Sequence, residues 1–277
     1  QRQMFIRDSS DAFISAMAKH PKNFSIQRLG CQGLWGFTRV LIRSELIGET
    51  PASSAARAVE VVLLAMKEFP KNSVVQHGLS LLEVMIRYGQ ANVIIRSGGI
   101  QTVLISIANH VGDPGVCKVG IMLLQELQYG GSESQGLFDA SFSIGTVLSV
   151  MGHHPKDSAI QQHSLKLLDD LKKSMGVRDW AIVFADEGGI EVCLSSMKMH
   201  FNDLCIQQYG CVALNAIVKI GLRQRIADAG GVDLVIDAIK NFSCDTMILQ
   251  YGGNTVDYLF SPDNDEDEDE TDLAAID

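Results

Sequence analysis

The sequence predicts an all-α protein: a solenoid of about six stacked three-helix repeats over residues 1–260, followed by a disordered acidic tail over residues 261–277. Three observations support this prediction: the composition, a segment that recurs every 41–49 residues, and glycine pairs in register with that segment. Hydrophobic residues make up 46% of the 277 residues, whereas aromatic residues make up only 6%. An aliphatic-rich chain with few aromatic residues suits close-packed helices better than a β-sandwich.

The recurring segment predicts the longest helix of each repeat. Counted from its first residue as position 0, positions 4, 5, 8 and 11 are also small or apolar. At 100° per residue these positions fall on one face of a helix, which is typical of a buried stripe. The segments begin at Ile26, Val75 (with one residue deleted), Val116, Ile160, Ile206 and Ile248.

Glycine pairs mark a sharp corner before this helix. The second glycine stands 17 residues ahead of the segment in Gly98-Gly99, Gly188-Gly189 and Gly230-Gly231. Glycine adopts the backbone angles that a tight corner needs. The other repeats have Ser9, Ala58 and Ser143 at the place of the second glycine. We therefore expect each repeat to contain a short first helix, a turn, a second helix, a further turn and a long third helix.

Further positions keep the same register. An apolar residue follows the second glycine position by eight residues, and a histidine or phenylalanine precedes the third helix by six. The apolar residues are Met17, Met66, Ile107, Met151, Met197 and Ile239. The second set is His20, Phe69, His110, His154, His200 and Phe242, which we interpret as turn residues that close helix two, with Pro21, Pro70 and Pro155 stopping three of these helices.

The expected repeats span about 1–44, 45–88, 89–130, 131–174, 175–220 and 221–260. The opening residues align with the first helix of a repeat, so we expect residues upstream to be missing.

The formal charge is −10, and nine acidic residues without Lys or Arg lie within 261–277, which leaves about −1 for the rest. A near-neutral body gives no electrostatic reason to bind nucleic acid or anionic lipid.

The six cysteines form no C-x-x-C pair, and no apolar run is long enough for a membrane span. We therefore expect a monomeric cytoplasmic protein with free thiols.

Three-helix repeats of about 42 residues resemble the armadillo-repeat family of β-catenin and importin-α. The resemblance is carried by the GG-I/V turns and the helices IQRLGCQGL and IQQYGCVAL. It implies a right-handed superhelix whose groove, lined by the third helices, binds extended peptides or partner domains without catalysis.

The import receptors of this family carry Trp at position 6 and Asn at position 10 of successive third helices. Here position 6 holds Gln32, Ser80, Met122, Lys166, Val212 and Asn254. Position 10 holds Gly36, Val84, Glu126, Asp170, Ala216 and Tyr258. The missing ladder argues against the first alternative, a karyopherin-like transport receptor for basic peptides.

The chain also resembles, in architecture only, the armadillo-repeats-only proteins of apicomplexan secretory organelles, which are lipid-anchored and recruit a motor. That resemblance implies an adaptor on the cytosolic face of an organelle membrane, anchored through an upstream segment. A further alternative is the regulatory repeat segment of a larger enzyme. The preferred hypothesis is a non-catalytic scaffold or adaptor for partner proteins.

Charged residues on the predicted groove face are the candidate partner-binding site. Positions 9 and 10 form an acidic row and position 13 a basic row, which together suit a partner of mixed or basic charge. The basic row also has a simpler explanation, because cations are favoured at helix C-termini. Trp35 and Tyr258 are candidate aromatic anchors. The full set is Trp35, Arg39, Glu83, Arg87, Glu126, Lys166, Asp169, Asp170, Lys173, Asn215, Lys219, Asp257 and Tyr258.

We expect no enzyme activity, metal or cofactor. The recurring histidines stand one per repeat, too far apart to share a metal ion. Cys31 and Cys211 fall at position 5, in the predicted core, and the adjacent Asp169 and Asp170 diverge by about 100° on a helix and cannot form a catalytic dyad. The acidic tail has three interpretations: a binding element for basic surfaces, an autoinhibitory strip competing for Arg39, Arg87 and Lys219, or a solubilising terminus.

Overall fold

The computed structural model describes residues 2–43, 52–71, 73–129 and 140–261, and within these ranges every regular element is a helix. The all-α prediction is therefore confirmed. The helices are α1 (Arg2–Lys19), α2 (Phe24–Arg43), α3 (Ala52–Glu68), α4 (Val74–Arg87), α5 (Ala91–Arg96), α6 (Gly99–Asn109), α7 (Pro114–Gln128), α8 (Ala140–His153), α9 (Ser158–Met175), α10 (Val177–Asp186), α11 (Gly189–Met199), α12 (Leu204–Val218), α13 (Arg223–Asp228), α14 (Gly231–Asn241), the π-helical turn η2 (Ile248–Gly252) and α15 (Gly253–Phe260).

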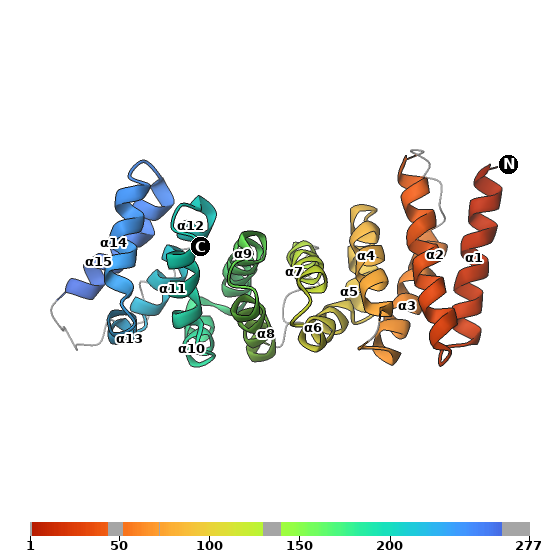
Figure 1. The fold of residues 1–277 in the computed structure, drawn as a ribbon, viewed down its shortest axis with the longest axis horizontal. Coiled ribbons are helices and arrows are strands. Elements are labelled where there is room, and N and C mark those ends of the chain that lie inside the picture. Colours follow the sequence, from red (N-terminus) through yellow and green to blue (C-terminus); the bar gives the residue numbers. More distant parts are fainter. Residues whose placement is uncertain (1, 44–51, 72, 130–139, 262–277) are drawn as a thin grey trace.

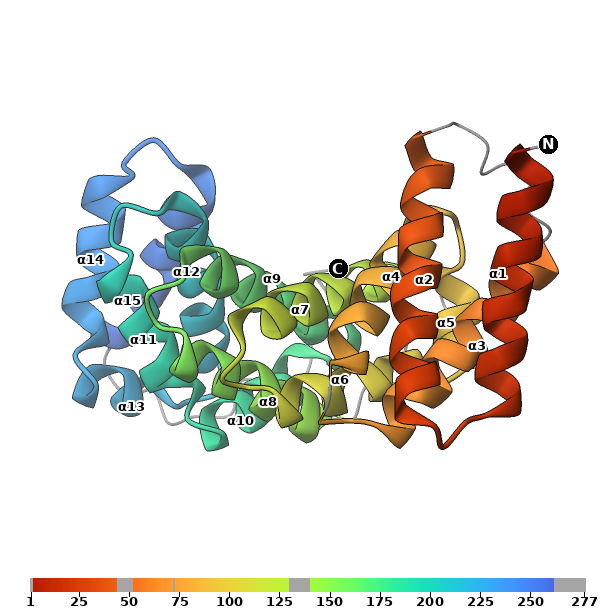
Figure 2. The ribbon, with the colours of Figure 1, turned by 45° about the vertical axis from the view of Figure 1, so that its right-hand side comes forward.

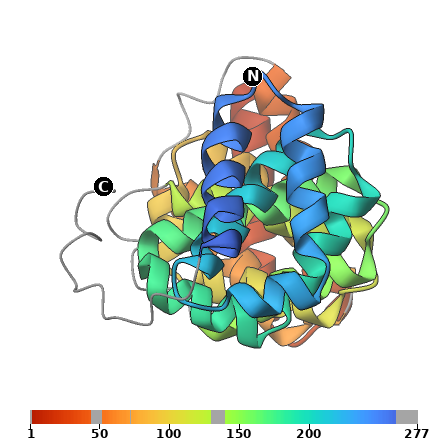
Figure 3. The same ribbon diagram turned by 90° about the vertical axis from the view of Figure 1, so that its left-hand side faces the viewer.

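The helices are stacked in the order of the sequence, so that the colours run from one end of the molecule to the other (Figure 1). The predicted third helices form one layer, in which α2, α4, α7, α9, α12 and the η2–α15 helix each contact the next. The predicted second helices α1, α3, α6, α8, α11 and α14 form the other layer in the same way. Figure 2 shows the two layers along the length of the stack, and Figure 3 shows it from the α14–α15 end. This is a repeat-like packing of helical hairpins, in which each hairpin contacts mainly its neighbours.

The glycine pairs make the predicted corners. Gly98, Gly188 and Gly230 have φ angles of 76°, 78° and 75° and cap α6, α11 and α14. A residue with a side chain is disfavoured in this left-handed region. The short helices α5, α10 and α13 therefore end at these corners, and the three-helix prediction holds for these three repeats.

In the first two repeats the three-helix prediction is wrong. The place of the left-handed glycine is taken by Asp8 and Arg57. Without a glycine the corner is costly, and the helix continues: α1 runs through Asp8 and α3 runs through Arg57 without a break. In the fourth repeat the predicted corner at Ser143 is also absent, because α8 runs from Ala140 through Ser143 without a break. Most of the predicted first helix of this repeat falls within residues 130–139, outside the described residues.

The two layers interlock through the glycines at position 4 of the third helix. A Cβ built on Gly210 would lie 2.5 Å from the Met197 sulfur, and one on Gly120 would lie 2.5 Å from Ile107. Met197 and Ile107 are the apolar residues predicted eight residues after the glycine corner. The position therefore stays small because a helix-two side chain fills the space.

All six predicted turn residues stand directly after the last residue of helix two, from His20 after Lys19 to Phe242 after Asn241. A buried glutamine at position 1 of the third helix fixes this turn through hydrogen bonds. Gln207, for example, donates to the Met197 and His200 carbonyls at 2.8 and 3.2 Å, and Gln27 and Gln161 do the same in their own repeats. The turn interpretation of the histidines is thus confirmed.

Aspartates cap the third helices and also join neighbouring repeats. Asp203 accepts from the Ile206 amide at 3.2 Å, and Asp245 accepts from the Ile248 amide at 2.9 Å. The second oxygen of each carboxylate accepts from a glutamine of the preceding third helix: Gln162 at 2.6 Å for Asp203, and Gln208 at 2.8 Å for Asp245.

Candidate functional site

A cleft of about 660 Å³ lies between the third helices α9 and α12 and is closed on its sides by the start of α10 and by η2. Four of the predicted partner-binding residues line it: Asp169, Lys173, Asn215 and Lys219. Its other lining residues are Lys172, Gly176, Val177, Arg178, Asp179, Tyr209, Val212, Ala216, Met247 and Tyr251. The cleft combines an apolar floor with charged and phenolic groups, which is typical of a binding site.

The wall formed by α9 holds a network of charges. Lys172 Nζ lies 2.7 Å from Asp169 Oδ1, and Lys173 Nζ lies 3.0 Å from Asp169 Oδ2 and 3.1 Å from Asp170 Oδ1. The buried Asp170 also accepts a bifurcated hydrogen bond from the Tyr129 hydroxyl at the end of α7, which lies 3.0 and 2.9 Å from its Oδ1 and Oδ2. Asp169 and Asp170 therefore act together on one cation, and Asp170 connects two neighbouring third helices.

These contacts shift two pKa values. Burial acts to lower the pKa of Lys173, but the hydrogen bonds and charges of Asp169 and Asp170 outweigh it and raise that pKa. Burial, followed by the hydrogen bond to Asp170, raises the pKa of Tyr129. Lys173 therefore stays charged and paired at neutral pH.

Arg178 and Lys219 are the cations that the cleft leaves unpaired: neither forms an ion pair with any residue that the structure describes. Lys219 caps the C-terminal end of α12, where a positive charge is favoured. Arg178 follows Gly176, whose φ of 87° separates α9 from α10.

Asn215 supplies an unpaired acceptor inside the cleft. Its side chain is 5% exposed, and its Oδ1 accepts no hydrogen bond from the described residues. A buried acceptor without a donor costs about 1–3 kcal/mol. A ligand that brings an N–H or O–H group to this atom would remove that cost.

The far wall of the cleft is formed by Met247, the N-cap residue of the π-helical turn η2, and by Tyr251 within that turn. Turns of this kind are uncommon and frequently lie at functional sites. Tyr209 occupies the equivalent position 3 on α12, so two tyrosines flank the apolar floor formed by Val212 and Ala216.

The other predicted residues do not join the cleft. Glu83 pairs with Arg87 at 2.6 Å on α4, and Glu126 lies on α7 close enough for both charges to act on its pKa. Trp35 is half-buried and packs against the core, whereas Asp257 and Tyr258 are exposed on α15. Lys166 is half-buried on α9, and the Arg39 side chain lies outside what the structure describes.

Glu126 is held in an unfavourable environment. Burial raises the pKa of the Glu126 carboxyl, and the negative charge of Glu83 raises it further. The positive charge of Arg87 lowers this pKa, but by less than burial raises it. In addition, Glu126 Oε2 accepts no hydrogen bond from the described residues. An acid whose pKa is raised on folding destabilises the folded state when it is ionised, and this penalty disappears as the pH falls through that pKa.

We therefore expect Glu126→Gln to stabilise the chain at about pH 7, by up to about 1 kcal/mol because the group is only partly buried, and to have no stabilising effect at about pH 3. Urea denaturation at both pH values measures this, with Glu191→Gln on the exposed face of α11 as the control. A loss of stability at pH 7 would show that the Arg87 attraction outweighs burial.

The surroundings of two histidine and two cysteine side chains indicate structural roles. His154 and His200 hydrogen-bond through Nε2 to the Val111 and Pro155 carbonyls of the preceding turns, at 2.7 and 2.8 Å. Cys31 and Cys211 are fully buried, and burial raises the pKa of each thiol to about 12. Across the described ranges, no three His, Cys, Asp or Glu side chains gather closely enough to hold a metal ion.

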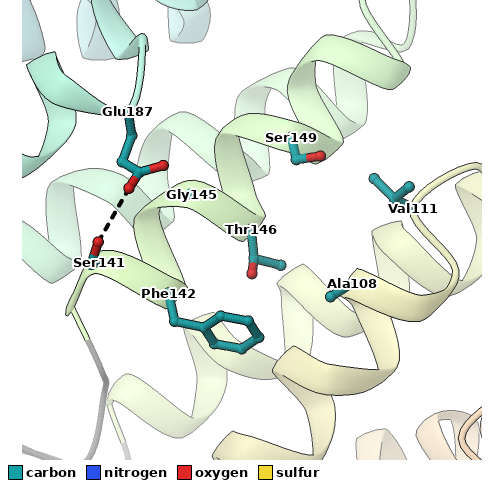
Figure 4. Close-up of a pocket in the computed structure, with 8 residues that line it drawn as sticks. All are labelled: Ala108, Val111, Ser141, Phe142, Gly145, Thr146, Ser149 and Glu187. Atoms are coloured by element: carbon teal, nitrogen blue, oxygen red, sulfur yellow. Dashed lines mark hydrogen bonds between the residues drawn. The ribbon is translucent and has the colours of Figure 1, made fainter.

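A second cavity of about 560 Å³ lies on the other layer, between α6 and α8 (Figure 4). The Ser141 hydroxyl donates to Glu187 at 3.2 Å at one side, and Phe142, Thr146 and Ala108 face the opening. None of its lining residues has a buried side-chain N or O atom without a hydrogen-bond partner. This cavity is therefore a weaker candidate for a binding site than the cleft.

Comparison with known proteins gives no family: no family model matches this chain, and no curated protein matches it. Among the helices of the described ranges, none combines the length and the apolar character needed to cross a bilayer.

Proposed function

We propose that this chain is an armadillo-type scaffold of the cytosol, with a right-handed superhelical stack, that binds a segment of a partner protein in the cleft between α9 and α12. The observation that carries the proposal is the cleft itself: an apolar floor between two tyrosines, an unpaired acceptor on Asn215, and two unpaired cations on Arg178 and Lys219. These groups match an extended peptide with main-chain N–H groups, an apolar side chain and carboxylates.

The charges argue for an acidic rather than a basic ligand. Three residues of the acidic row predicted on the groove are paired internally: Asp169 with Lys172 and Lys173, Asp170 with Lys173, and Glu83 with Arg87. A basic peptide would have to break these contacts, whereas an acidic peptide would complete those of Arg178 and Lys219.

The test is a peptide selection with the immobilised full chain and a random library, followed by fluorescence anisotropy titration of the selected peptides. We expect Lys219→Glu to weaken binding at least about fivefold, because it reverses a charge at the cleft. Lys198→Glu is the matched control, since Lys198 also stands near the C-terminal end of a helix but lies on α11, away from the cleft. Equal affinity of the two variants would refute the proposed site.

A further inference from the structure

We propose that the acidic segment 262–277 of this chain binds in the same cleft, with its carboxylates on Arg178 and Lys219, and so competes with a partner. The inference concerns the cleft of the proposed function, but its evidence is separate. It comes from where the segment starts, how far it reaches and what charge it carries.

The start of the segment is fixed. Ser261 caps α15 with extended backbone angles of φ −63° and ψ 135°, and its carbonyl accepts a hydrogen bond of 3.1 Å from Arg223 at the start of α13. The next residue in the sequence is Pro262, which cannot continue a helix. The chain therefore leaves α15 beside the first residue of α13.

This exit lies on the same edge of the stack as the cleft cations. Ser261 is the C-cap residue of α15, as Lys219 is of α12, and Lys173 lies in the last turn of α9. Because α9, α12 and α15 pack side by side in sequence order, these helix ends fall along one edge. The segment thus begins next to the row of cations.

The reach of the segment matches the span of the cleft. Neighbouring packed helices are about 8–10 Å apart, so Lys219 lies about one helix spacing and Lys173 about two from the exit. An extended chain advances about 3.3 Å per residue. The acidic residues from Asp263 to Asp267 therefore cover distances of roughly 7–20 Å from Ser261, which include both helices.

The charges are complementary. The segment carries nine acidic residues and no Lys or Arg. The cleft is lined by the cations Lys172, Lys173, Arg178 and Lys219 and by two carboxylates, of which Asp169 is already paired. A tethered ligand acts at an effective concentration in the millimolar range, so even weak individual contacts suffice for occupancy.

Zero-length carbodiimide cross-linking of the full chain, followed by mass spectrometry, tests the inference directly. We expect cross-linked peptides that join carboxylates of residues 263–272 to Lys219, within the monomer and independent of protein concentration, with a yield that falls at least about threefold in 1 M salt because exposed charges are then screened. Lys22 and Lys156 are internal controls, since they are exposed in turns at the opposite ends of the third helices. Cross-links distributed equally over Lys22, Lys156 and Lys219, or no link to Lys219, would overturn the inference.

A second measurement uses a full-length variant with D265N, E266Q, D267N, E268Q, D269N and E270Q. If the segment occupies the cleft, this variant binds a cleft peptide at least about fivefold more tightly than the unmodified chain. Unchanged affinity would contradict competition. Because the cross-linking needs no partner, a failure to find any binding peptide would refute the proposed function alone.

Discussion

Trp180→Ala is expected to lower the free energy of unfolding by about 3–5 kcal/mol, the range for removing a fully buried tryptophan. The indole is 1% exposed, stacks on Phe184 with ring centroids 4.5 Å apart, and has Lys172 Nζ 5.9 Å from its centroid. Its loss would leave a cavity beneath the start of α10, which forms a side of the cleft. Urea denaturation followed by circular dichroism measures the loss.

Trp180→Phe is the matched variant. It keeps an aromatic ring against Phe184 and removes an indole N–H that has no acceptor among the described residues, so we expect a loss below about 1.5 kcal/mol. Hydrogen exchange then distinguishes local from global effects: in the alanine variant, protection should fall most in α10 and its neighbours α8, α9 and α12. Similar losses for both variants would mean that stacking on Phe184 contributes little.

Gly189→Ala is expected to cost about 1–3 kcal/mol, the usual range for adding atoms to a closely packed position. A Cβ at this residue would lie 2.6 Å from the Phe184 carbonyl oxygen and 2.6 Å from its ring. A main-chain oxygen cannot rotate away as a flexible side chain can, so α10 and α11 would have to separate. Thermal denaturation of the purified variant measures the effect.

Gly152→Ala provides the control, because it is also a glycine inside a helix but its Cβ would have no neighbour within 4 Å. There we expect a gain of up to about 1 kcal/mol from the better helix propensity of alanine. A Gly189 variant that is as stable as the Gly152 variant would show that the corner can open without cost.

Much of the fold follows from the sequence because the repeat imposes the same requirement at the same position each time. The glycine corners, the histidines and phenylalanines that end helix two, and the apolar residues opposite Gly120 and Gly210 are all identifiable from spacing alone. The exceptions are the first, second and fourth repeats. There the position of the left-handed glycine holds Asp8, Arg57 and Phe142, and a single helix runs through the predicted corner.

The candidate site was predicted less completely. Asp169, Lys173, Asn215 and Lys219 follow from their positions on the third helix. Arg178 lies in the first turn of α10, outside the register of the third helices, and Tyr251 depends on a π-helical turn that periodicity does not show. The internal pairing was accessible from the sequence, because positions 9 and 13 are four residues apart and an acid and a base at that spacing meet on a helix.

The double hydrogen bonding of Asp203 and Asp245 has a consequence for how the stack loses its structure. Each carboxylate caps one helix through one oxygen and accepts from the glutamine of the helix before it through the other, so the helix start and the contact between hairpins depend on the same side chain. When one hairpin opens, its neighbour loses part of its own support. Unfolding is therefore expected to spread between adjacent hairpins as a cooperative front, and a cleft formed by two of them is retained or lost as a unit.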